Sequence, residues 1–234
     1  FGLMLLGFII EEVTGQTLDV FLDERVFDPL GMRDTGYNPR SWADPVPVGM
    51  GTGEAAPEPD GALPILARVA PTEVDTVYRH THVHGVVHDE NAYALGGVAG
   101  HAGLFSSARD LAIFAQMMLN GGEYRGVRVL DSATIALFTR RAEGSRRALG
   151  WEKPTGTSGA GDYFSPRAFG HTGFTGTSVW IDPEYDVFVV LLTNRVNPTR
   201  DNTKHAALRK AVHDAVILSI TDMPVRKREA GEKR

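Results

Sequence analysis

The sequence predicts an α/β (α+β) fold, in which a small sheet is flanked by helices and joined to a helical lobe. Apolar residues recur at helical spacing in the first 30 residues and again over 108–119. Residues 177–181 are expected to form a strand, and residues 187–193 are almost continuously apolar, which is typical of a buried strand. A last helical pattern follows the strands, so helices precede and follow the sheet.

Two helices are predicted at the start of the chain. Regularly spaced leucine, isoleucine and valine residues predict a helix over 1–13, and Gly15 is a suitable stop for it. A second helix fits residues 17–27, and we expect Pro29 to end it. Residues 37–71 are dense in proline and glycine and lack apolar periodicity, so a long surface loop is expected there.

Capping residues delimit the elements in the middle of the chain. Ser107 is a suitable N-cap for a strongly amphipathic helix over 108–119. Residues 123–131 predict a short hairpin. Asp131 then precedes a short helix over 132–138, and we expect it to cap that helix.

The last part of the chain predicts three strands and a helix. Strands are expected over 168–173, 177–181 and 187–193, and the apolar third strand should be central and covered on both faces. A helix is expected over 201–220. Its expected apolar face consists of Ala207, Leu208, Ala211, Val212, Ala215 and Val216. Residues 1–166 would then form mostly helical lobe and loops, and residues 167–220 the sheet strands and C-terminal helix.

Composition excludes several classes of function. The chain has 234 residues, 42% of them hydrophobic and 23% charged, as in ordinary globular proteins. Its net charge of -5 argues against nucleic acid as a partner, and the polar tail over 226–234, which contains several basic residues, is expected to fray. Cysteine is absent, which excludes disulfides and thiolate metal sites. No run of 18 apolar residues is present, so no membrane span is expected.

One motif at the start of the predicted sheet suggests chemistry. His171, Thr172, Gly173 and Phe174 lead into a hairpin with a second glycine at position 176. Glycine lets a ligand or another backbone approach closely, and a strand at a sheet edge presents free N–H groups. Such N–H groups can stabilise an oxyanion that develops during acyl transfer. A tight bulge with a surface histidine is the alternative interpretation.

A second group of residues suggests a metal. His80, His82 and His84 alternate along the chain, and His88 and His101 follow. Three imidazoles on one face of a strand can bind zinc, so a zinc hydrolase using the His80–His88 cluster is an alternative function. A loop that is merely rich in histidine is the more ordinary interpretation, and no metal or other cofactor is assigned.

Three segments together resemble the serine β-lactamase-related hydrolases, which include class C β-lactamases, D-alanyl-D-alanine carboxypeptidases and esterase-like penicillin-binding proteins. Residues 1–37, which end in PLGMRDTGY, are similar to the stretch that follows the family's Tyr-x-Asn element. Residues 96–122 resemble its glycine-rich approach to a helix beside the active site. Residues 169–195, beginning FGHTGFTG, are similar to its Lys/His-Thr-Gly strand and the partner strand.

This resemblance implies a β-lactamase/transpeptidase-like fold, in which a mixed sheet flanked by helices packs against a helical lobe. It also implies a serine nucleophile in a Ser-x-x-Lys motif, with lysine and tyrosine moving protons. By motif match His171 takes the place of the family's lysine or histidine and would hold substrate or tune the tyrosine. Thr172 and Gly173 complete the triplet, and the Phe174 N–H would donate to the oxyanion. The implied partner is a small-molecule or peptide acyl substrate.

The chain departs from the family pattern in two motifs. No serine stands in Ser-x-x-Lys, and no Tyr-x-Asn is present. Both motifs precede the matched first helix in the family, and Phe1 already lies in that helix. We therefore expect a C-terminal fragment whose nucleophile lies upstream and which cannot acylate alone. A catalytically inactive module of the same fold that binds a peptidoglycan-like ligand is the alternative. By analogy with the family, the location is periplasmic or extracellular.

Overall fold

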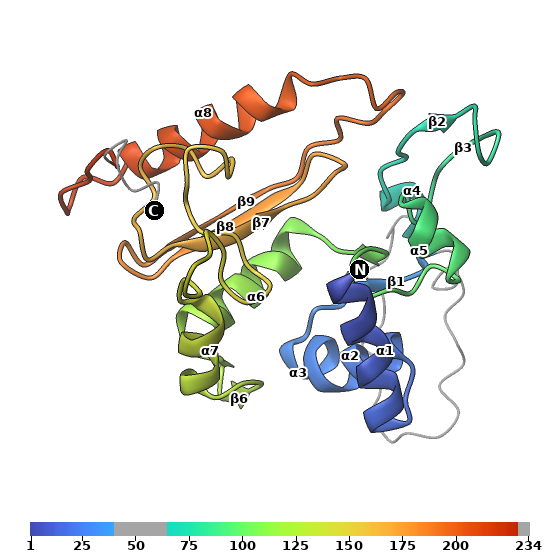
Figure 1. The fold of residues 1–234 in the computed structure, drawn as a ribbon, viewed down its shortest axis with the longest axis horizontal. Helices are drawn as coiled ribbons and strands as arrows, with labels where there is room; N and C mark the ends of the chain where they lie inside the picture. Colours follow the sequence, from blue (N-terminus) through green and yellow to red (C-terminus); the bar gives the residue numbers. More distant parts are fainter. Residues whose placement is uncertain (40–64, 229–234) are drawn as a thin grey trace, which may run out of the picture. The chain divides into compact units, whose positions relative to one another are not determined.

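The computed structural model describes residues 1–39 and 65–228, which divide into two compact units (Figure 1). The first unit comprises residues 1–20 and 36–105, and the second comprises residues 21–35 and those from 106 onward. Most of the predicted loop over 37–71 lies outside the described residues. Within residues 1–39 and 65–228, no helix has the length and apolar character needed to cross a membrane.

The first unit is built around helix α1 (Gly2–Thr14) and the glycine-rich segment that contacts it. Gly15 ends α1 as predicted, with a φ of 69° and its N–H donating to the Glu11 carbonyl at 2.8 Å. A Cβ on Gly100 would lie 2.1 Å from the Leu3 carbonyl oxygen, so only glycine allows this approach to α1. The remaining elements are β1 (Gly36–Tyr37), α4 (Ile65–Arg68), β2 (Val74–Asp75), β3 (Thr81–His82), α5 (Glu90–Ala94) and β4 (Leu104–Phe105).

The second predicted helix is longer than the sequence suggested. Its path runs through α2 (Leu18–Leu22), a π-helical turn η1 (Asp23–Phe27) and α3 (Asp28–Leu30). Pro29 does not end it, because Pro29 stands in the first turn of α3, directly after the π-helical turn, where proline is tolerated. The helical path ends instead at Gly31, whose φ is 70°.

The predicted elements in the middle of the chain are present. Helix α6 spans Ala108–Leu119, and the Ser107 hydroxyl accepts from the Asp110 N–H at 3.2 Å, which confirms the predicted N-cap. Strands β5 (Glu123–Tyr124) and β6 (Val127–Arg128) form the hairpin, with positive φ at Arg125 and Gly126. Helix α7 spans Ser132–Thr139, but the Asp131 side chain makes no capping hydrogen bond, so that detail was wrong.

The second unit contains the largest described sheet, in the order β7-β8-β9. Strands β7 (Phe169–Thr172), β8 (Ser178–Asp182) and β9 (Val187–Leu191) are antiparallel neighbours. Helix α6 covers one face of this sheet and helix α8 (His205–Leu218) the other (Figure 1). Side chains alternate accordingly: Ile181 packs in the core that includes Met117 of α6, and Trp180 in the core that includes Ile217 of α8.

The prediction that residues 187–193 form a central strand was wrong for the described residues. Strand β8 is the middle strand, with four of its five residues buried, whereas only Val189 is buried in β9. The continuous apolar run of β9 still has a physical reason, because helices contact the strand from both faces.

The buried face of α8 also differs from the prediction. Arg209, His213 and Ile217 are buried, whereas Leu208, on the expected apolar face, is 52% exposed. The helix turns these polar residues inward because the described loops offer them acceptors. Arg209 Nη2 donates to the Thr177 carbonyl at 3.1 Å, and His213 Nδ1 lies 2.9 Å from the Gly159 carbonyl.

The beginning of the polar tail is anchored, which corrects the expectation of a frayed terminus for residues up to 228. The Arg228 N–H donates to the Asp162 carbonyl at 2.9 Å, and its guanidinium Nη1 donates to the Phe164 carbonyl at 2.9 Å. Lys227 adds an ion pair of 3.3 Å with the Asp162 carboxylate. These three contacts from Lys227 and Arg228 hold this part of the tail against the loop that contains Asp162 and Phe164.

Lys153 is a buried amine in the second unit. Its Nζ donates to the Thr139 carbonyl at 3.0 Å and to the Arg167 carbonyl at 2.9 Å, and the residue is 3% exposed. Burial, reinforced by Arg141, lowers the pKa of Lys153 from 10.5 to about 8. The amine therefore joins the end of α7 to the loop before β7 at an electrostatic cost that depends on pH.

We expect this cost to appear in the pH dependence of stability. Below pH 8 Lys153 is charged in both the folded and the unfolded protein, so the full cost of burying the charge is present. Between pH 8 and 10.5 the amine is deprotonated in the folded protein but still protonated in the unfolded protein. The free energy of unfolding therefore rises with pH over this range. The rise attributable to Lys153 is on the order of 3 kcal/mol. Urea unfolding of Lys153→Met should lack this rise, and the exposed control Lys204→Met should keep it. Equal slopes for both variants would contradict the assignment.

Candidate active site

The candidate residues lie where strand β7 ends and the hairpin to β8 begins. His171 and Thr172 are the last two residues of β7, and they pair with Val179 and Ser178 of β8. Gly173 follows, and its N–H donates to the Thr177 carbonyl at 2.8 Å. The Gly176 N–H donates to the Gly173 carbonyl at 3.1 Å, which closes a tight turn over residues 173–176.

The His171 imidazole is held by two hydrogen bonds. Arg147 Nη2 lies 2.9 Å from Nε2, and Nδ1 lies 2.9 Å from the Thr172 carbonyl oxygen. Because a guanidinium can only donate, Nε2 must accept, and Nδ1 must then carry the proton that Thr172 accepts. Arg147 also forms an ion pair of 3.2 Å with Glu152, so one guanidinium joins a carboxylate to the imidazole.

The outer edge of β7 is less open than the sequence predicted. Gly170 exchanges two backbone hydrogen bonds with Glu152, at 2.8 and 3.1 Å, so a short segment covers the strand there. The Gly173 N–H is turned toward Thr177. The expectation of free N–H groups along this strand is therefore wrong at Gly170 and Gly173. The Thr172 hydroxyl, in contrast, has no hydrogen-bond partner within residues 1–39 and 65–228.

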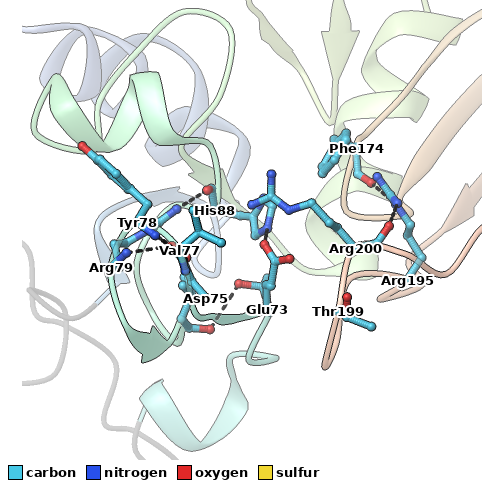
Figure 2. A network of polar contacts seen from close by, with 12 residues as sticks. Glu73, Asp75, Val77, Tyr78, Arg79, His88, Phe174, Arg195, Thr199 and Arg200 are labelled. Carbon is cyan, nitrogen blue, oxygen red and sulfur yellow. Dashed lines mark hydrogen bonds and ion pairs between the residues drawn. The ribbon is translucent and has the colours of Figure 1, made fainter.

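Two arginines give the turn a positively charged surface. The Phe174 ring is 58% exposed, and the Arg195 guanidinium carbon lies 4.1 Å from its centroid. The Arg200 guanidinium carbon lies 6.0 Å from the same centroid. Figure 2 shows the Phe174 carbonyl directed at Arg195 and the Arg195 side chain reaching the Arg200 backbone. An anionic group would be favoured beside this turn.

The second unit also contains a serine–histidine pair that the sequence did not reveal. Ser178 Oγ lies 3.3 Å from His213 Nε2, and both side chains are buried. Burial lowers the pKa of His213, while its hydrogen bond to the Gly159 carbonyl opposes that effect. A nucleophilic serine must be accessible to its substrate, whereas the Ser178 side chain is buried where β8 faces α8. The pair is therefore structural.

The predicted zinc cluster is not assembled. Within residues 1–39 and 65–228, no three potential ligand residues lie close enough to hold a metal ion. Strand β3 covers only Thr81–His82, so the three histidines do not share one face. His84 Nε2 contacts the Leu66 and Val69 carbonyls at 2.9 Å, whereas His88 Nε2 lies 2.9 Å from the Glu73 carboxylate (Figure 2). The zinc hydrolase interpretation was wrong.

Asp75, another carboxylate of the first unit, is also committed to the fold. Asp75 accepts from the Tyr78 N–H at 2.8 Å and from Arg79 Nε at 3.2 Å (Figure 2). These donors, led by the Tyr78 N–H, hold the pKa of Asp75 below its usual range. His101 pairs with Asp89, whose side chain also caps α5. The first unit therefore uses its histidines and acids to fasten loops.

Tyr37 is unsuited to act as a proton acceptor. Burial, followed by the charge of Asp19, raises the pKa of Tyr37 to about 12. Its hydroxyl donates to the Ala99 carbonyl at 3.3 Å within the first unit. Tyr37 thus does not replace the tyrosine that the family motif implies.

The second unit contains a cavity of about 780 Å³. Its lining comes from α3, α6, the β5–β6 hairpin and Phe188, and includes none of His171, Thr172, Gly173 and Phe174. The residues that the motif identifies therefore lie outside this hollow.

Comparison with known proteins identifies the fold. The sequence profile of the β-lactamase family matches residues 1–214. A putative D-alanyl-D-alanine carboxypeptidase from Salmonella typhi is 38% identical over 206 residues, which are 86% of this chain and 45% of that protein. The chain thus belongs to the β-lactamase family of serine hydrolases, and it spans slightly less than half of that relative.

Solved structures agree with this fold. A β-lactamase from Mycobacterium bovis superposes with a TM-score of 0.58 at 22% identity, over 93% of this chain and 61% of its own. The simvastatin synthase of Aspergillus terreus superposes with a TM-score of 0.60 at 15% identity, over 93% and 54%. The predicted α+β, β-lactamase/transpeptidase-like fold is confirmed.

The His171 geometry makes a prediction that spectroscopy can test. Replacing Arg147 with methionine removes the donor to Nε2, which is one of the two contacts that favour a proton on Nδ1; the other, to the Thr172 carbonyl, remains. We expect long-range ¹H–¹⁵N spectra to show the Nδ1–H tautomer in the unmodified chain and a shift toward Nε2–H in Arg147→Met. The exposed neighbour Arg146, replaced in the same way, serves as the control. An Nε2–H tautomer in the unmodified chain would contradict the assignment.

Proposed function

We propose that this chain supplies part of the active site of a serine hydrolase that cleaves an ester, amide or β-lactam bond through an acyl-enzyme. The preferred substrate class is a peptide ending in D-alanyl-D-alanine, so the activity is of the carboxypeptidase type. The single observation that carries this proposal is the Thr172-Gly173 end of β7, where a threonine hydroxyl with no hydrogen-bond partner among the described residues lies beside a positively charged turn. The name of the Salmonella typhi relative supports the same reaction.

Each residue of the motif has a role in this proposal. The Phe174 N–H donates to the oxyanion of the tetrahedral intermediate. The Thr172 hydroxyl donates to the terminal carboxylate of the peptide, and the positive turn attracts that carboxylate. Gly173 leaves space for the substrate backbone. His171 holds substrate or tunes the proton-carrying tyrosine, and it is not the nucleophile because both of its ring nitrogens are engaged.

The nucleophile comes from outside these 234 residues. A serine hydroxyl attacks an acyl carbon only when a base removes its proton, and this sequence contains neither Ser-x-x-Lys nor Tyr-x-Asn. In this proposal an upstream segment of the same polypeptide carries both motifs, and the 234-residue chain alone does not acylate. The protein acts on cell-wall peptides and is exported to the periplasm or the cell exterior.

Covalent labelling tests the mechanism. The complete open reading frame and the 234-residue chain should each be exposed to a fluorophosphonate and to benzylpenicillin, followed by intact-mass analysis. We expect a one-to-one adduct on the longer polypeptide, mapped to the serine of a Ser-x-x-Lys peptide, and none on the shorter chain. No adduct on either protein would contradict the serine mechanism, and an adduct on a serine of the shorter chain would contradict the upstream nucleophile.

Substrate recognition can be tested at Thr172. In the complete polypeptide, Thr172→Val should raise KM about tenfold for a peptide with a free C-terminal D-alanine, because one charge-assisted hydrogen bond is lost. An ester analogue whose C-terminal carboxylate is replaced by a carboxamide should be hydrolysed equally by the wild-type protein and by Thr172→Val. Equal loss on both substrates would show that Thr172 does not bind the carboxylate.

A further inference from the structure

The turn that follows β7 has an unusual property: each of its backbone carbonyls accepts a hydrogen bond. The Gly173 carbonyl accepts from the Gly176 N–H, and the Thr177 carbonyl accepts from both the Gly173 N–H and Arg209 Nη2. The carbonyls of residues 174–176 accept from the segment 193–195. The donors inside the turn reach only the Gly173 and Thr177 carbonyls, so the other three carbonyls depend on donors from outside the turn.

Arg195 provides most of the contacts from the 193–195 segment. Its backbone N–H donates to the Thr175 carbonyl at 2.8 Å, and its side-chain Nε donates to the Phe174 carbonyl at 2.7 Å. The same guanidinium stacks on the Phe174 ring and donates through Nη1 to the Arg200 carbonyl at 2.5 Å (Figure 2). One side chain therefore holds the carbonyl and the ring of a single residue.

The second glycine of the motif makes this contact possible. Gly176 has a φ of 115°, and a Cβ there would lie 2.8 Å from the Thr193 carbonyl oxygen and 3.1 Å from the Arg195 nitrogen. Both facts restrict the position to glycine. The Thr193 hydroxyl completes the contact by donating to the Gly176 carbonyl at 2.6 Å.

These bonds fix the direction of the N–H groups between them. A trans peptide is planar, so each N–H points opposite to the carbonyl that precedes it. The carbonyl before the Phe174 N–H is held inside the hairpin, and the carbonyl after it is held by Arg195. The Phe174 N–H lies in the first of these two peptide planes, and Arg195 holds the second, so the peptides on both sides of the Phe174 Cα are hydrogen-bonded.

We propose that Arg195 is a positioning residue. By holding the Phe174 carbonyl and ring it fixes the peptide that follows Phe174, and it thereby helps to keep the Phe174 N–H, which lies in the peptide held through the Gly173 carbonyl, aimed at the oxyanion. This inference rests on the proposed function, in which that N–H stabilises the tetrahedral intermediate. Donors aimed in advance at the developing charge need no reorganisation during reaction. Arg195 does this without touching the reacting atoms, and Thr193 and Arg209 hold the neighbouring carbonyls.

The test uses Arg195→Lys in the complete polypeptide. Lysine keeps the positive charge and the backbone bond to Thr175, but it lacks the planar fork that holds Phe174 and Arg200 together. Acylation should be measured with a matched oxoester and thionoester. Sulfur is a weak hydrogen-bond acceptor, so an intact oxyanion site favours the oxoester, and a misaligned site loses that preference. We expect the oxoester acylation rate to fall about tenfold in Arg195→Lys and the thionoester rate to change little.

Two further proteins make the result unambiguous. Arg125→Lys is the matched control, because the Arg125 guanidinium also stacks on an aromatic ring, that of Tyr124 at 5.3 Å, but contacts no carbonyl of the turn. Thr193→Val removes only the bond to the Gly176 carbonyl, so it tests the same mechanism if Arg195→Lys fails to fold. It should reduce the oxoester preference in the same direction.

The outcomes separate this inference from the proposed function. An unchanged ratio of oxoester to thionoester rates in both Arg195→Lys and Thr193→Val, with the wild-type protein active, overturns the positioning role and leaves the hydrolase intact. Equal slowing of both esters also overturns it, since general disorder would act on both. Absence of acylation in the wild-type protein overturns the proposed function and this inference with it.

Discussion

The antiparallel pairing of β7 with β8 is the constraint on which the candidate site depends. Four residue pairs, from Phe169↔Ile181 to Thr172↔Ser178, fix the register, and the chain must then reverse within residues 173–177. A shift by one residue would turn Trp180 and Ile181 to the wrong faces and exchange the two cores. Because Trp180 also lies against Gly170, where a Cβ would be 2.4 Å from its ring, the register has little freedom. The core packing therefore determines where the motif stands.

Local signals in the sequence were sufficient for most elements. The Ser107 cap predicted α6 at its observed first residue, and residues 123–131 predicted the hairpin, because both depend on hydrogen bonds and dihedral angles within a few residues. Pro29 misled for an equally local reason. A proline is tolerated in the first turn of a helix, and the sequence does not show that a new helical segment begins there.

The errors arose where distant residues decide the outcome. The inward face of α8 depends on acceptors at Thr177 and Gly159, which are 32 and 54 residues from their donors. The histidines were grouped by their spacing, yet their partners lie elsewhere in the first unit. For the site, the motif was recognisable from its residues, but Arg147 and Arg195 were not. No sequence pattern indicates which arginine will contact an imidazole 24 residues away.

The exchange of lysine for histidine in the motif changes where positive charge stands. A lysine at position 171 would carry its own ammonium, whereas here the imidazole accepts a hydrogen bond from Arg147, and the charge lies on that guanidinium one side chain farther away. Arg147 is half-exposed and paired with Glu152, so its field is weakened by solvent and by the carboxylate. On the other side, Arg195 places a second guanidinium against Phe174. Positive charge thus lies on Arg147 beside the His171 imidazole and on Arg195 against Phe174, an arrangement that favours an anionic group next to the turn.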